Sequence, residues 1–401
     1  MMGRGEIGMS QLGAKTFLVI MAATHGLYGE AFLRELKRAG HRVVVVTRAE
    51  ALGYEWPRAL IDDLFAVPDI FNAQELENAA TYLAREVAFD RIVGPGEYDI
   101  ELAARLREHF RLPGLGDSAA RLVRDKLAMR DCAHRHGVLV PQFLAALHLP
   151  AIARFLESVP GPWIIKPRMA ASSKGITVCH DKESVWRTVH GLGDRLSHHL
   201  IEKFTPGDIY HLDGVVLNGE VCFASAHRYG RPILDLHTHG GVYTTWRIQT
   251  GSPEEIALQA LNQRVIQALG LAEGVFHIEY IHDRETGQFY FLEASARVGA
   301  GLIEDMVEAE SGLNLWACWA RIEMGDRTPP PPDKNVYAGV LASAAAVERP
   351  DARPFENEHV RAVPAKPYHL GLLVSDASAD AVSQRLESLA AAVAQQVMVH
   401  F

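Results

Sequence analysis

Two apolar stretches of this sequence are interrupted by charged side chains that a buried strand would normally lack. Glu279 lies within VFHIEYI, and Glu293 follows FYFL within FYFLEASARVGAG at 289–301. Strand alternation places Glu293, Ser295 and Arg297 on one face. If the stretches form a hairpin, the two glutamates lie side by side, and such a pair resists ionising unless a cation separates it. Mg²⁺ would meet this need; alternatively, one glutamate faces solvent and the other pairs with Arg297.

A lysine and a loop of small residues follow another apolar stretch. Lys166 comes directly after WII, and the loop MAASSKG occupies 169–175. Backbone amides of such a loop can close over phosphates. The complete GxxxxGK[ST] pattern is absent, and a lysine at a strand end is often a surface residue. Together, Lys166 and the loop nevertheless indicate a phosphate site.

The end of the next predicted strand offers groups suited to a nucleoside. Glu202 and Lys203 precede Phe204, and the free backbone groups of a strand end can contact the edge of a purine. Asp208 could bind the hydroxyls of a ribose. Lys126, in VRDKLAMR, lies on a predicted helix, where a solvated charge is the default interpretation.

The elements that must position these side chains begin with alternating strands and helices. Strand–helix alternation predicts a parallel, doubly wound N-terminal sheet. The predicted elements are strands at 16–23, 41–47 and 91–94 and helices at 30–39 and 73–86. GPGE at 94–97 follows the last strand, at the sheet edge where ligands bind, so Glu97 is a candidate substrate residue. The first loop lacks GxGxxG, which argues against a dinucleotide site.

The remainder of the chain favours antiparallel sheet. We expect one amphipathic helix within 117–141, turn-linked strands within 163–178 and 200–217, a helix at 253–269, and the hairpin of 275–282 with 288–293. Four prolines at 329–332 indicate a linker. A strand-rich segment and one helix near 377–394 follow.

Composition restricts the class of protein. A chain of 401 residues predicts two or three domains. The net charge of −9 argues against nucleic acid or an anionic membrane as partner. The four cysteines form no CxxC pair, the N-terminus has no apolar signal region, and no run approaches the roughly 20 apolar residues of a membrane span. We therefore expect a cytoplasmic protein.

The order of these features resembles the ATP-grasp superfamily across about 90–325. The matching segments are GPGEYDIELAARL, RDKLAMRDCAHRHGVLVP, WIIKPRMAASSKGI, LIEKFTPGDIYHLDGVV, FHIEYI and FLEASARVGAG. Within the superfamily, the chain is most similar to carboxylate–amine ligases of the L-amino-acid ligase group, and more distantly to biotin carboxylase and carbamoyl-phosphate synthase.

The resemblance implies an α/β (α+β) fold with four parts. These are an N-terminal doubly wound parallel sheet, a lid subdomain, a central antiparallel sheet domain and a small C-terminal domain. The implied boundaries are a flexible tail at 1–15, the N-terminal domain at 16–115, the ATP-grasp region at 116–328 with its lid at about 150–205, and the linker and C-terminal subdomain at 329–401.

The resemblance also implies roles for individual residues. Lys126 and Lys166 would hold the ATP phosphates under a mobile loop that includes Ser172, Ser173, Lys174 and Gly175; Glu202, Lys203 and Phe204 would contact adenine; Asp208 would bind ribose; Glu279, Glu293 and Ser295 would bind Mg²⁺; and Arg297 and Lys174 would act in catalysis. The family usually has Asn at the position of Ser295, so a direct metal bond is weakest there.

Substrate residues are expected between the nucleotide and metal motifs. In HRYGR and GGVYTTWR, Arg228 or Arg247 could bind a carboxylate, and Tyr243 and Trp246 could wall a side-chain pocket. The remaining candidates are His227 and Gly299. His237 and His239 form HTH, which is a weak zinc signal because no third ligand accompanies them.

The implied function is an ATP-dependent ligase that activates a carboxylate as an acyl-phosphate and joins it to an amine. Its cofactors would be ATP and two Mg²⁺ ions, with Mn²⁺ as an alternative metal, and its partners small-molecule carboxylates and amines. Two other readings stay open: a carboxylase acting through carboxyphosphate, and a non-catalytic nucleotide-binding protein. The sequence also leaves open whether a homodimer forms.

Overall fold

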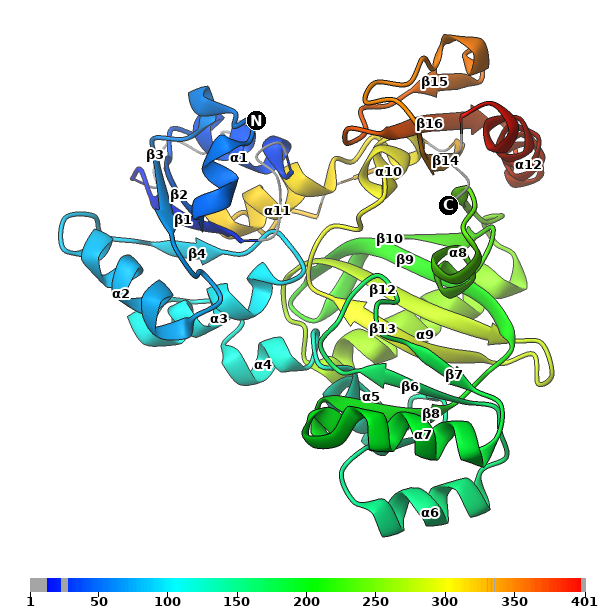
Figure 1. Cartoon of the computed structure of the whole chain (residues 1–401). Helices are drawn as coiled ribbons and strands as arrows, with labels where there is room; N and C mark the ends of the chain where they lie inside the picture. The colour runs from blue at the N-terminus through cyan, green and yellow to red at the C-terminus, as the bar shows by residue number, and fades with distance from the viewer. Residues whose placement is uncertain (1–12, 23–27, 330, 333, 335, 398–401) are drawn as a thin grey trace, which may run out of the picture. The chain divides into compact units, whose positions relative to one another are not determined.

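The computed structural model describes residues 13–22, 28–329, 331–332, 334 and 336–397. The chain divides into two compact units (Figure 1). The first comprises Met1–Asp117 and Ala320–Asp326, and the second comprises Ser118–Trp319 and Arg327–Phe401. No helix of the described residues is both long enough and apolar enough to cross a membrane.

The first unit is built on a four-stranded parallel sheet. The strand order is β3-β2-β1-β4, and each neighbouring pair is parallel. The strands are β1 (Thr16–Met21), β2 (Arg42–Arg48), β3 (Asp63–Val67) and β4 (Arg91–Val93), and the helices are α1 (Glu30–Arg38), α2 (Ala73–Ala84), α3 (Asp99–Phe110), η1 (Ala49–Gly53) and η2 (Arg58–Leu60). The predicted N-terminal parallel sheet is thus confirmed; Ala23, the end of its first predicted strand, lies outside the described residues.

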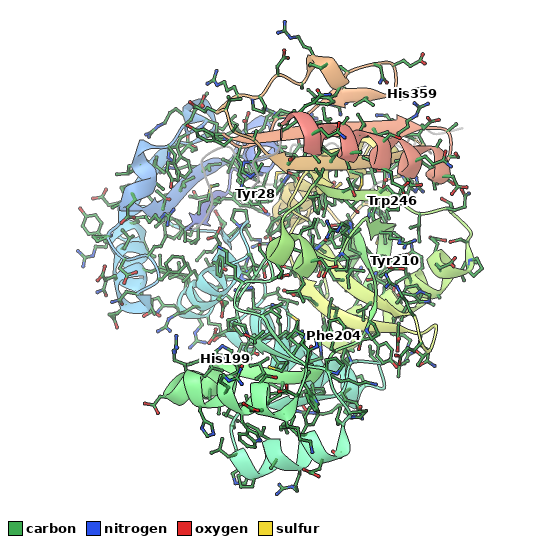
Figure 2. The ribbon with its side chains drawn as sticks, turned by 45° about the vertical axis from the view of Figure 1, so that its right-hand side comes forward. Tyr28, His199, Phe204, Tyr210, Trp246 and His359 are labelled. Atoms are coloured by element: carbon green, nitrogen blue, oxygen red, sulfur yellow. The ribbon has the colours of Figure 1, made fainter. Side chains whose placement is uncertain are left out.

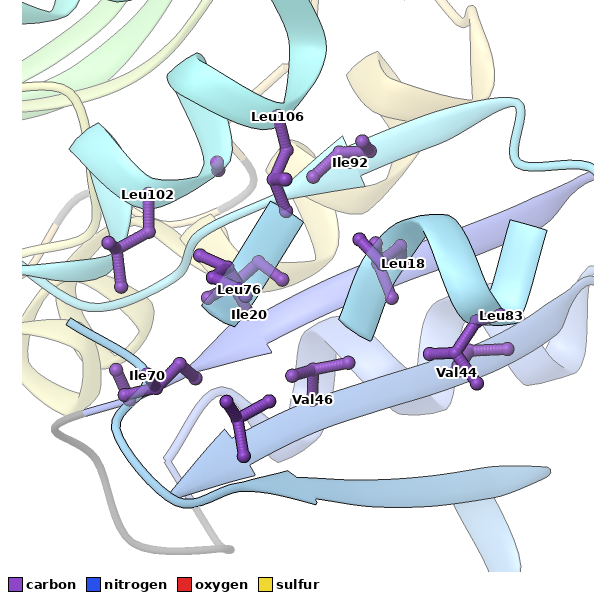
Figure 3. Close-up of a cluster of buried hydrophobic side chains, with 14 residues drawn as sticks. Leu18, Ile20, Val44, Val46, Ile70, Leu76, Leu83, Ile92, Leu102 and Leu106 are labelled. Atoms are coloured by element: carbon purple, nitrogen blue, oxygen red, sulfur yellow. The ribbon is translucent and has the colours of Figure 1, made fainter. Parts of the chain in front are cut away.

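An entirely apolar cluster fills one face of this sheet. Leucines of α2 and α3 pack against alternate residues of the strands (Figure 3). The labelled members are Leu18, Ile20, Val44, Val46, Ile70, Leu76, Leu83, Ile92, Leu102 and Leu106. Because both faces of a parallel sheet are covered, β1 and β2 read as continuous apolar runs rather than as alternating ones.

The second unit contains an eight-stranded antiparallel sheet. Its order is β13-β12-β9-β10-β11-β14-β16-β15. The strands are β9 (Gly207–Leu217), β10 (Glu220–Tyr229), β11 (Tyr243–Arg247), β12 (Gly274–Asp283), β13 (Phe289–Ser295), β14 (Tyr337–Ala344), β15 (Val360–Ala362) and β16 (His369–Asp376). The predicted hairpin is confirmed as β12 and β13. The strands after the proline segment extend this same sheet, through pairing of β14 with β11.

Helices cover the large sheet. Helix α9 contacts β10 and β13, and α12 contacts β11, β14 and β16. Further helices of the second unit are α8 (Ile233–His239) and α10 (Ile303–Ser311), with η4 (Arg353–Phe355); α9 is Pro253–Leu269 and α12 is Ala379–Gln396. Helix α11 (Leu315–Met324) is divided between the two units after Trp319. The helices predicted at 253–269 and near 377–394 are confirmed as α9 and α12.

A second, four-stranded antiparallel sheet has its own core. Its order is β5-β8-β6-β7, and apolar side chains of α6 and α7 pack against it. The elements are β5 (Phe143–Ala145), α6 (Leu149–Ser158), β6 (Trp163–Pro167), β7 (Thr177–Cys179), α7 (Lys182–Leu192), η3 (Gly193–His198) and β8 (His199–Lys203). These elements largely coincide with the predicted lid, whose boundaries stay a prediction.

The prediction of one continuous helix within 117–141 is wrong. The structure has two helices, α4 (Asp117–Arg121) and α5 (Lys126–Arg135). Asp125 interrupts them, because its side chain accepts hydrogen bonds from the backbone of Leu127 at 3.0 Å and Ala128 at 3.4 Å. An aspartate in this N-cap position starts a new helix.

Candidate active site

The two predicted metal carboxylates lie opposite each other in the hairpin. Glu279 of β12 is the register partner of Glu293 of β13, and the register shifts between Glu279 and Tyr280. Each carboxylate has a separate partner: Glu293 Oε1 lies 2.9 Å from Lys126 Nζ, and Glu279 Oε1 accepts from the Tyr229 hydroxyl at 2.9 Å. The alternative, in which one glutamate faces solvent and the other pairs with Arg297, stays open.

Lys126 connects the predicted phosphate loop to Glu293. It begins α5, and its side chain is buried rather than solvated, so the default interpretation of a surface charge is wrong. Its Nζ donates to the carbonyl of Ala170 at 2.7 Å as well as to Glu293. Its backbone N–H donates to the carbonyl of Arg168 at 2.9 Å. The side chain of Lys126 is thus bound to the loop itself, and its backbone to the residue just before the loop.

Lys166 is one of three charges buried together. Glu202 Oε2 lies 2.6 Å from Lys166 Nζ, and Glu202 Oε1 lies 2.5 Å from Arg130 Nε. Burial lowers the pKa of Lys166 to about 8 against the opposing influence of Glu202. Burial alone would raise the pKa of Glu202, but Arg130 and Lys166 outweigh it and hold that pKa below its usual value. Sequence reasoning missed Arg130, since its partner is 72 residues away.

The loop after β6 has a constrained backbone. Ser172, Ser173 and Gly175 have φ values of 56°, 55° and 73°. Serines are uncommon in this left-handed region. A Cβ at Gly175 would lie 2.9 Å from Pro167 Cγ. The side chains of Ser172 and Lys174 are exposed, so the loop presents hydroxyl and ammonium groups outward, and their predicted phosphate role stays a prediction.

The predicted nucleoside residues already have partners within the protein. The amide of Lys203 donates to Gln142 O at 2.8 Å, and that of Phe204 to Pro162 O at 2.9 Å. The carboxylate of Glu202 is bound by two cations. Contacts with adenine would therefore come from other groups of this segment, such as its carbonyls, and the predicted adenine roles stay predictions.

Asp208 lies between two arginines. Its Oδ2 is 2.9 Å from Arg228 Nη2, and its Oδ1 is 2.6 Å from Arg284 Nη2. The guanidinium of Arg228 also lies 5.8 Å from the centre of the Tyr210 ring. Arg228, a predicted substrate residue, thus forms an ion pair with the predicted ribose residue Asp208. The second partner, Arg284, was not predicted from the sequence.

Arg297 follows β13 on a half-buried turn. Its Nη1 donates to the carbonyl of Val298 at 2.7 Å. Ser295 is buried and is the register partner of His277. A Cβ at Gly299 would lie 2.4 Å from Asp213 Oδ1 and 3.2 Å from His277 Nδ1. The absence of a side chain at Gly299 therefore allows the turn to approach β9 and β12 closely.

The predicted substrate aromatics pack in different places. Tyr243 joins a cluster with Tyr229, whereas Trp246 packs in the core beneath α12 (Figure 2). Residues three apart on a strand point to opposite faces. The prediction that Tyr243 and Trp246 wall one pocket is therefore wrong. Arg247 ends the same strand, where it donates to Val336 O at 3.1 Å and lies 5.5 Å from the Tyr337 ring centre.

Two further predictions concern Glu97, as a substrate residue, and the two histidines of HTH, as a zinc site. Glu97 belongs to the first unit, in the loop between β4 and α3. Asp99 holds this loop by accepting from Ala22 N and Gly96 N, each at 2.9 Å. The side chains of His237 and His239 lie outside the described part of the chain, so their weak zinc signal stays untested.

Sequence reasoning missed most of a buried polar cluster in the large sheet. It comprises His211, Asp213, His227, His277 and Glu310, each at most 9% exposed; only His227 had been singled out, as a substrate residue. The Nδ1 of His211 lies 2.6 Å from Asp213 Oδ2, and that of His277 lies 2.9 Å from Asp213 Oδ1. His211 and Asp213 interrupt an apolar stretch just as Glu279 does, so the same signal could have found them.

The three imidazoles of this cluster differ in basicity. Burial lowers the pKa of His211 to about 4. Burial also opposes charge on the other two, but nearby carboxylates outweigh it: Glu310 and Asp213 raise the pKa of His227 to about 9, and Asp213 and Glu279 raise that of His277 to about 10. The cluster therefore holds positive charge on two imidazoles near neutral pH.

Comparisons with known proteins agree with the predicted resemblance. No family model matches the chain. It is 25% identical over 261 residues to an L-arginine-specific L-amino acid ligase of Bacillus subtilis, covering 64% of this chain and 62% of that protein. The chain thus spans less than two thirds of that relative's length.

Solved structures match more of the chain. An L-amino acid ligase from Bacillus licheniformis gives a TM-score of 0.75 at 18% identity, covering 96% of this chain and 98% of that one. The biotin carboxylase domain of a Hydrogenobacter thermophilus 2-oxoglutarate carboxylase, solved with MgADP and bicarbonate, gives 0.70 at 17% identity, covering 96% and 90%. These matches confirm the predicted fold class.

Proposed function

We propose that this chain, which has the ATP-grasp fold and resembles the L-amino-acid ligases, is an ATP-dependent carboxylate–amine ligase. The observation that carries the proposal is the pairing of Glu279 with Glu293, together with Lys126 between Glu293 and the 169–175 loop. An acid pair beside a buried lysine and a loop with exposed hydroxyls suits the transfer of a phosphoryl group from a metal-bound nucleotide.

The donor set of the hairpin fits Mg²⁺. Glu279 and Glu293 face each other in register, and both side chains retain some solvent exposure. Carboxylate oxygens are the ligands that Mg²⁺ takes from proteins when it binds nucleotide phosphates. When bound there, Mg²⁺ would offset the negative charge that gathers on the phosphoryl oxygens. Ser295 is the weaker candidate, and the number of ions stays part of the proposal.

In the first step, an oxygen of the substrate carboxylate attacks the γ-phosphorus of ATP, and the bond from that phosphorus to the ADP oxygen breaks. Lys126 and Lys166 would bind phosphate oxygens and stabilise the charge developing on them. The pKa of Lys166, about 8, leaves its ammonium largely charged at neutral pH. Lys174, on the exposed loop, would reach the phosphates from outside.

In the second step, the amine nitrogen attacks the carbonyl carbon of the acyl-phosphate, phosphate leaves, and the amine loses a proton. Arg297 would bind the oxygen that becomes negative during this attack. Water must be kept out, because it would hydrolyse the acyl-phosphate. The small sheet with its own core suits a lid that closes as one body.

We propose amino acids or related small acids as the carboxylate and amino acids as the amine, in keeping with the named relative. The substrate candidates of the unit that carries the hairpin stay predictions, together with Glu97 of the first unit. They are His227, Arg228, Tyr243, Trp246, Arg247 and Gly299. A cytoplasmic location, the absence of nucleic-acid and membrane partners, and the choice between monomer and homodimer remain predictions for experiment.

The test is ADP release by the purified protein with ATP and Mg²⁺ against a matrix of amino acids offered singly and in pairs. We expect release only with particular amino acids, accompanied by a dipeptide detectable by mass spectrometry. Release with bicarbonate and no amine would support the carboxylase reading instead. Nucleotide binding without ADP release for any combination would contradict the ligase proposal and support the nucleotide-binding reading.

A further inference from the structure

The buried cluster of the large sheet is centred on one carboxylate. Asp213 contacts three imidazoles: Oδ2 lies 2.6 Å from His211 Nδ1 and 3.5 Å from His227 Nδ1, and Oδ1 lies 2.9 Å from His277 Nδ1. The side chains come from three neighbouring strands, β9, β10 and β12. We name Asp213 and these three histidines the Asp213 network.

The outer nitrogens of the network point to three different partners. His277 Nε2 lies 3.5 Å from Glu279 Oε1, His211 Nε2 lies 2.7 Å from Thr245 Oγ1, and His227 Nε2 lies 3.0 Å from Glu310 Oε1. Only the first of these reaches a proposed metal carboxylate. His277 therefore bridges Asp213 and Glu279.

The turn that carries Arg297 rests on the same two residues. A Cβ at Gly299 would come within 2.4 Å of Asp213 Oδ1 and 3.2 Å of His277 Nδ1. Arg297 and Gly299 are two residues apart, and Arg297 is bound to the carbonyl of Val298 between them. The position of the Asp213 carboxylate therefore limits where this turn, and with it Arg297, can lie.

The network is better described as hydrogen-bonded than as a metal site. Ligand atoms of His211, Asp213 and His277 all lie within 4.8 Å of one another. Two ligand atoms on a tetrahedral zinc ion, each about 2.1 Å from it, would be about 3.4 Å apart. The 2.6 Å and 2.9 Å separations are instead those of hydrogen bonds between ring nitrogens and a carboxylate.

We propose that Asp213 is a positioning residue for the ligase reaction, acting through His277 on Glu279 and through Gly299 on the turn of Arg297. The proposal rests on the proposed function for its chemistry. A carboxylate that orients an imidazole, which in turn orients a metal carboxylate, fixes the geometry of the metal ligand. The proposed metal ligand Glu279 and the turn that carries Arg297 would then share one buried support.

The test replaces Asp213 by Asn, which keeps its size and removes its charge, and measures Mn²⁺ binding in the presence of ADP by electron paramagnetic resonance. We expect the dissociation constant for Mn²⁺ to rise by about tenfold or more, as when other supports of metal ligands are removed. In the ADP-release assay we expect kcat to fall while KM for the carboxylate changes little.

The matched control is Glu310→Gln, which changes an equally buried carboxylate that also binds an imidazole but at the far side of the network from Glu279. We expect Glu310→Gln to lower the melting temperature without weakening Mn²⁺ binding. If Asp213→Asn does not fold, His277→Gln cuts the same bridge and should weaken Mn²⁺ binding to the same degree.

Three results would overturn the proposal. These are unchanged Mn²⁺ binding in the folded Asp213 or His277 variant, equal weakening in Glu310→Gln, and stoichiometric zinc in the purified wild-type protein. Mn²⁺ binding needs no carboxylate or amine substrate. A failure to find any ligase activity would therefore contradict the proposed function, while the Mn²⁺ comparison would still decide the role of Asp213.

Discussion

The interiors of the two units differ in what they bury. In the first unit, the cluster between the parallel sheet and α2 and α3 is wholly apolar (Figure 3). In the second unit, Lys166 and Glu202 of the small sheet are buried with Arg130 of α5, and the large sheet buries the Asp213 network. Burying charge costs free energy unless each charge is paired. The first unit also buries Asp99 and Arg107, and both bind backbone groups there. In the second unit, charged side chains are instead buried against one another, as we expect of the unit that would hold a charged substrate.

The largest effect should follow from Glu293→Ala. If the hairpin binds Mg²⁺, this change removes one of two carboxylate ligands and also leaves the buried Lys126 without its anion. We expect ADP release to fall by at least about a hundredfold. The measurement is ADP release under saturating ATP and Mg²⁺.

The control for Glu293 is Glu285→Ala, on the exposed turn of the same hairpin. It should retain wild-type activity. Full turnover in Glu293→Ala would refute the metal role and remove the main functional distinction between the two units.

The next effect concerns stability. Glu202→Gln would leave Lys166 and Arg130 buried together without a negative charge between them. Breaking a buried ion pair on one side costs about 3–5 kcal/mol. Urea unfolding followed by circular dichroism measures this loss.

Leu106→Ala provides the apolar counterpart in the first unit, where a cavity costs about 2–5 kcal/mol. The two variants should differ in salt dependence, because only Glu202→Gln leaves uncompensated charge. Equal stability of Glu202→Gln and wild type would mean that the charge of Glu202 is not needed to keep Lys166 and Arg130 buried.

A smaller effect should appear as a pH dependence of stability. Burial raises the pKa of Glu304 on α10 from 4.5 to about 7, so the folded state holds its proton where the unfolded state has lost it. Stability should therefore fall as pH rises from about 4.5 to 7. Glu304→Gln should remove the Glu304 contribution to this fall, so that its stability falls less with pH than that of wild type, and it should be more stable than wild type at pH 8 by at most about 3 kcal/mol.

Urea unfolding at pH 5, 6, 7 and 8 checks the Glu304 prediction. Glu308→Gln, on the exposed side of the same helix, is the matched control and should follow wild type. Parallel curves for Glu304→Gln and wild type would show that this carboxyl is not protonated in the folded protein.

The sequence alone predicted the features that depend on local patterns. Glu279 and Glu293 could be found because each breaks an apolar run, and the hairpin follows from the turn between them. The break at Asp125 was missed because a capping residue resembles any other polar residue of an amphipathic helix. Arg130 and Glu310 were missed because their buried partners lie 72 and 83 residues away, and only the folded chain brings them together.

The smallest predicted effect is a gain at Ser295, where the resemblance expects asparagine. Asn offers a carbonyl oxygen, a better ligand for a hard cation than a neutral hydroxyl. Ser295→Asn should lower the Mg²⁺ concentration for half-maximal ADP release by about two- to threefold. Ser225→Asn on β10 adds the same atoms at another buried serine and should cost stability without this gain. If Ser295→Asn instead needs more Mg²⁺, the buried side chain at 295 supports His277 across the hairpin rather than the metal, and the metal set is limited to the two glutamates.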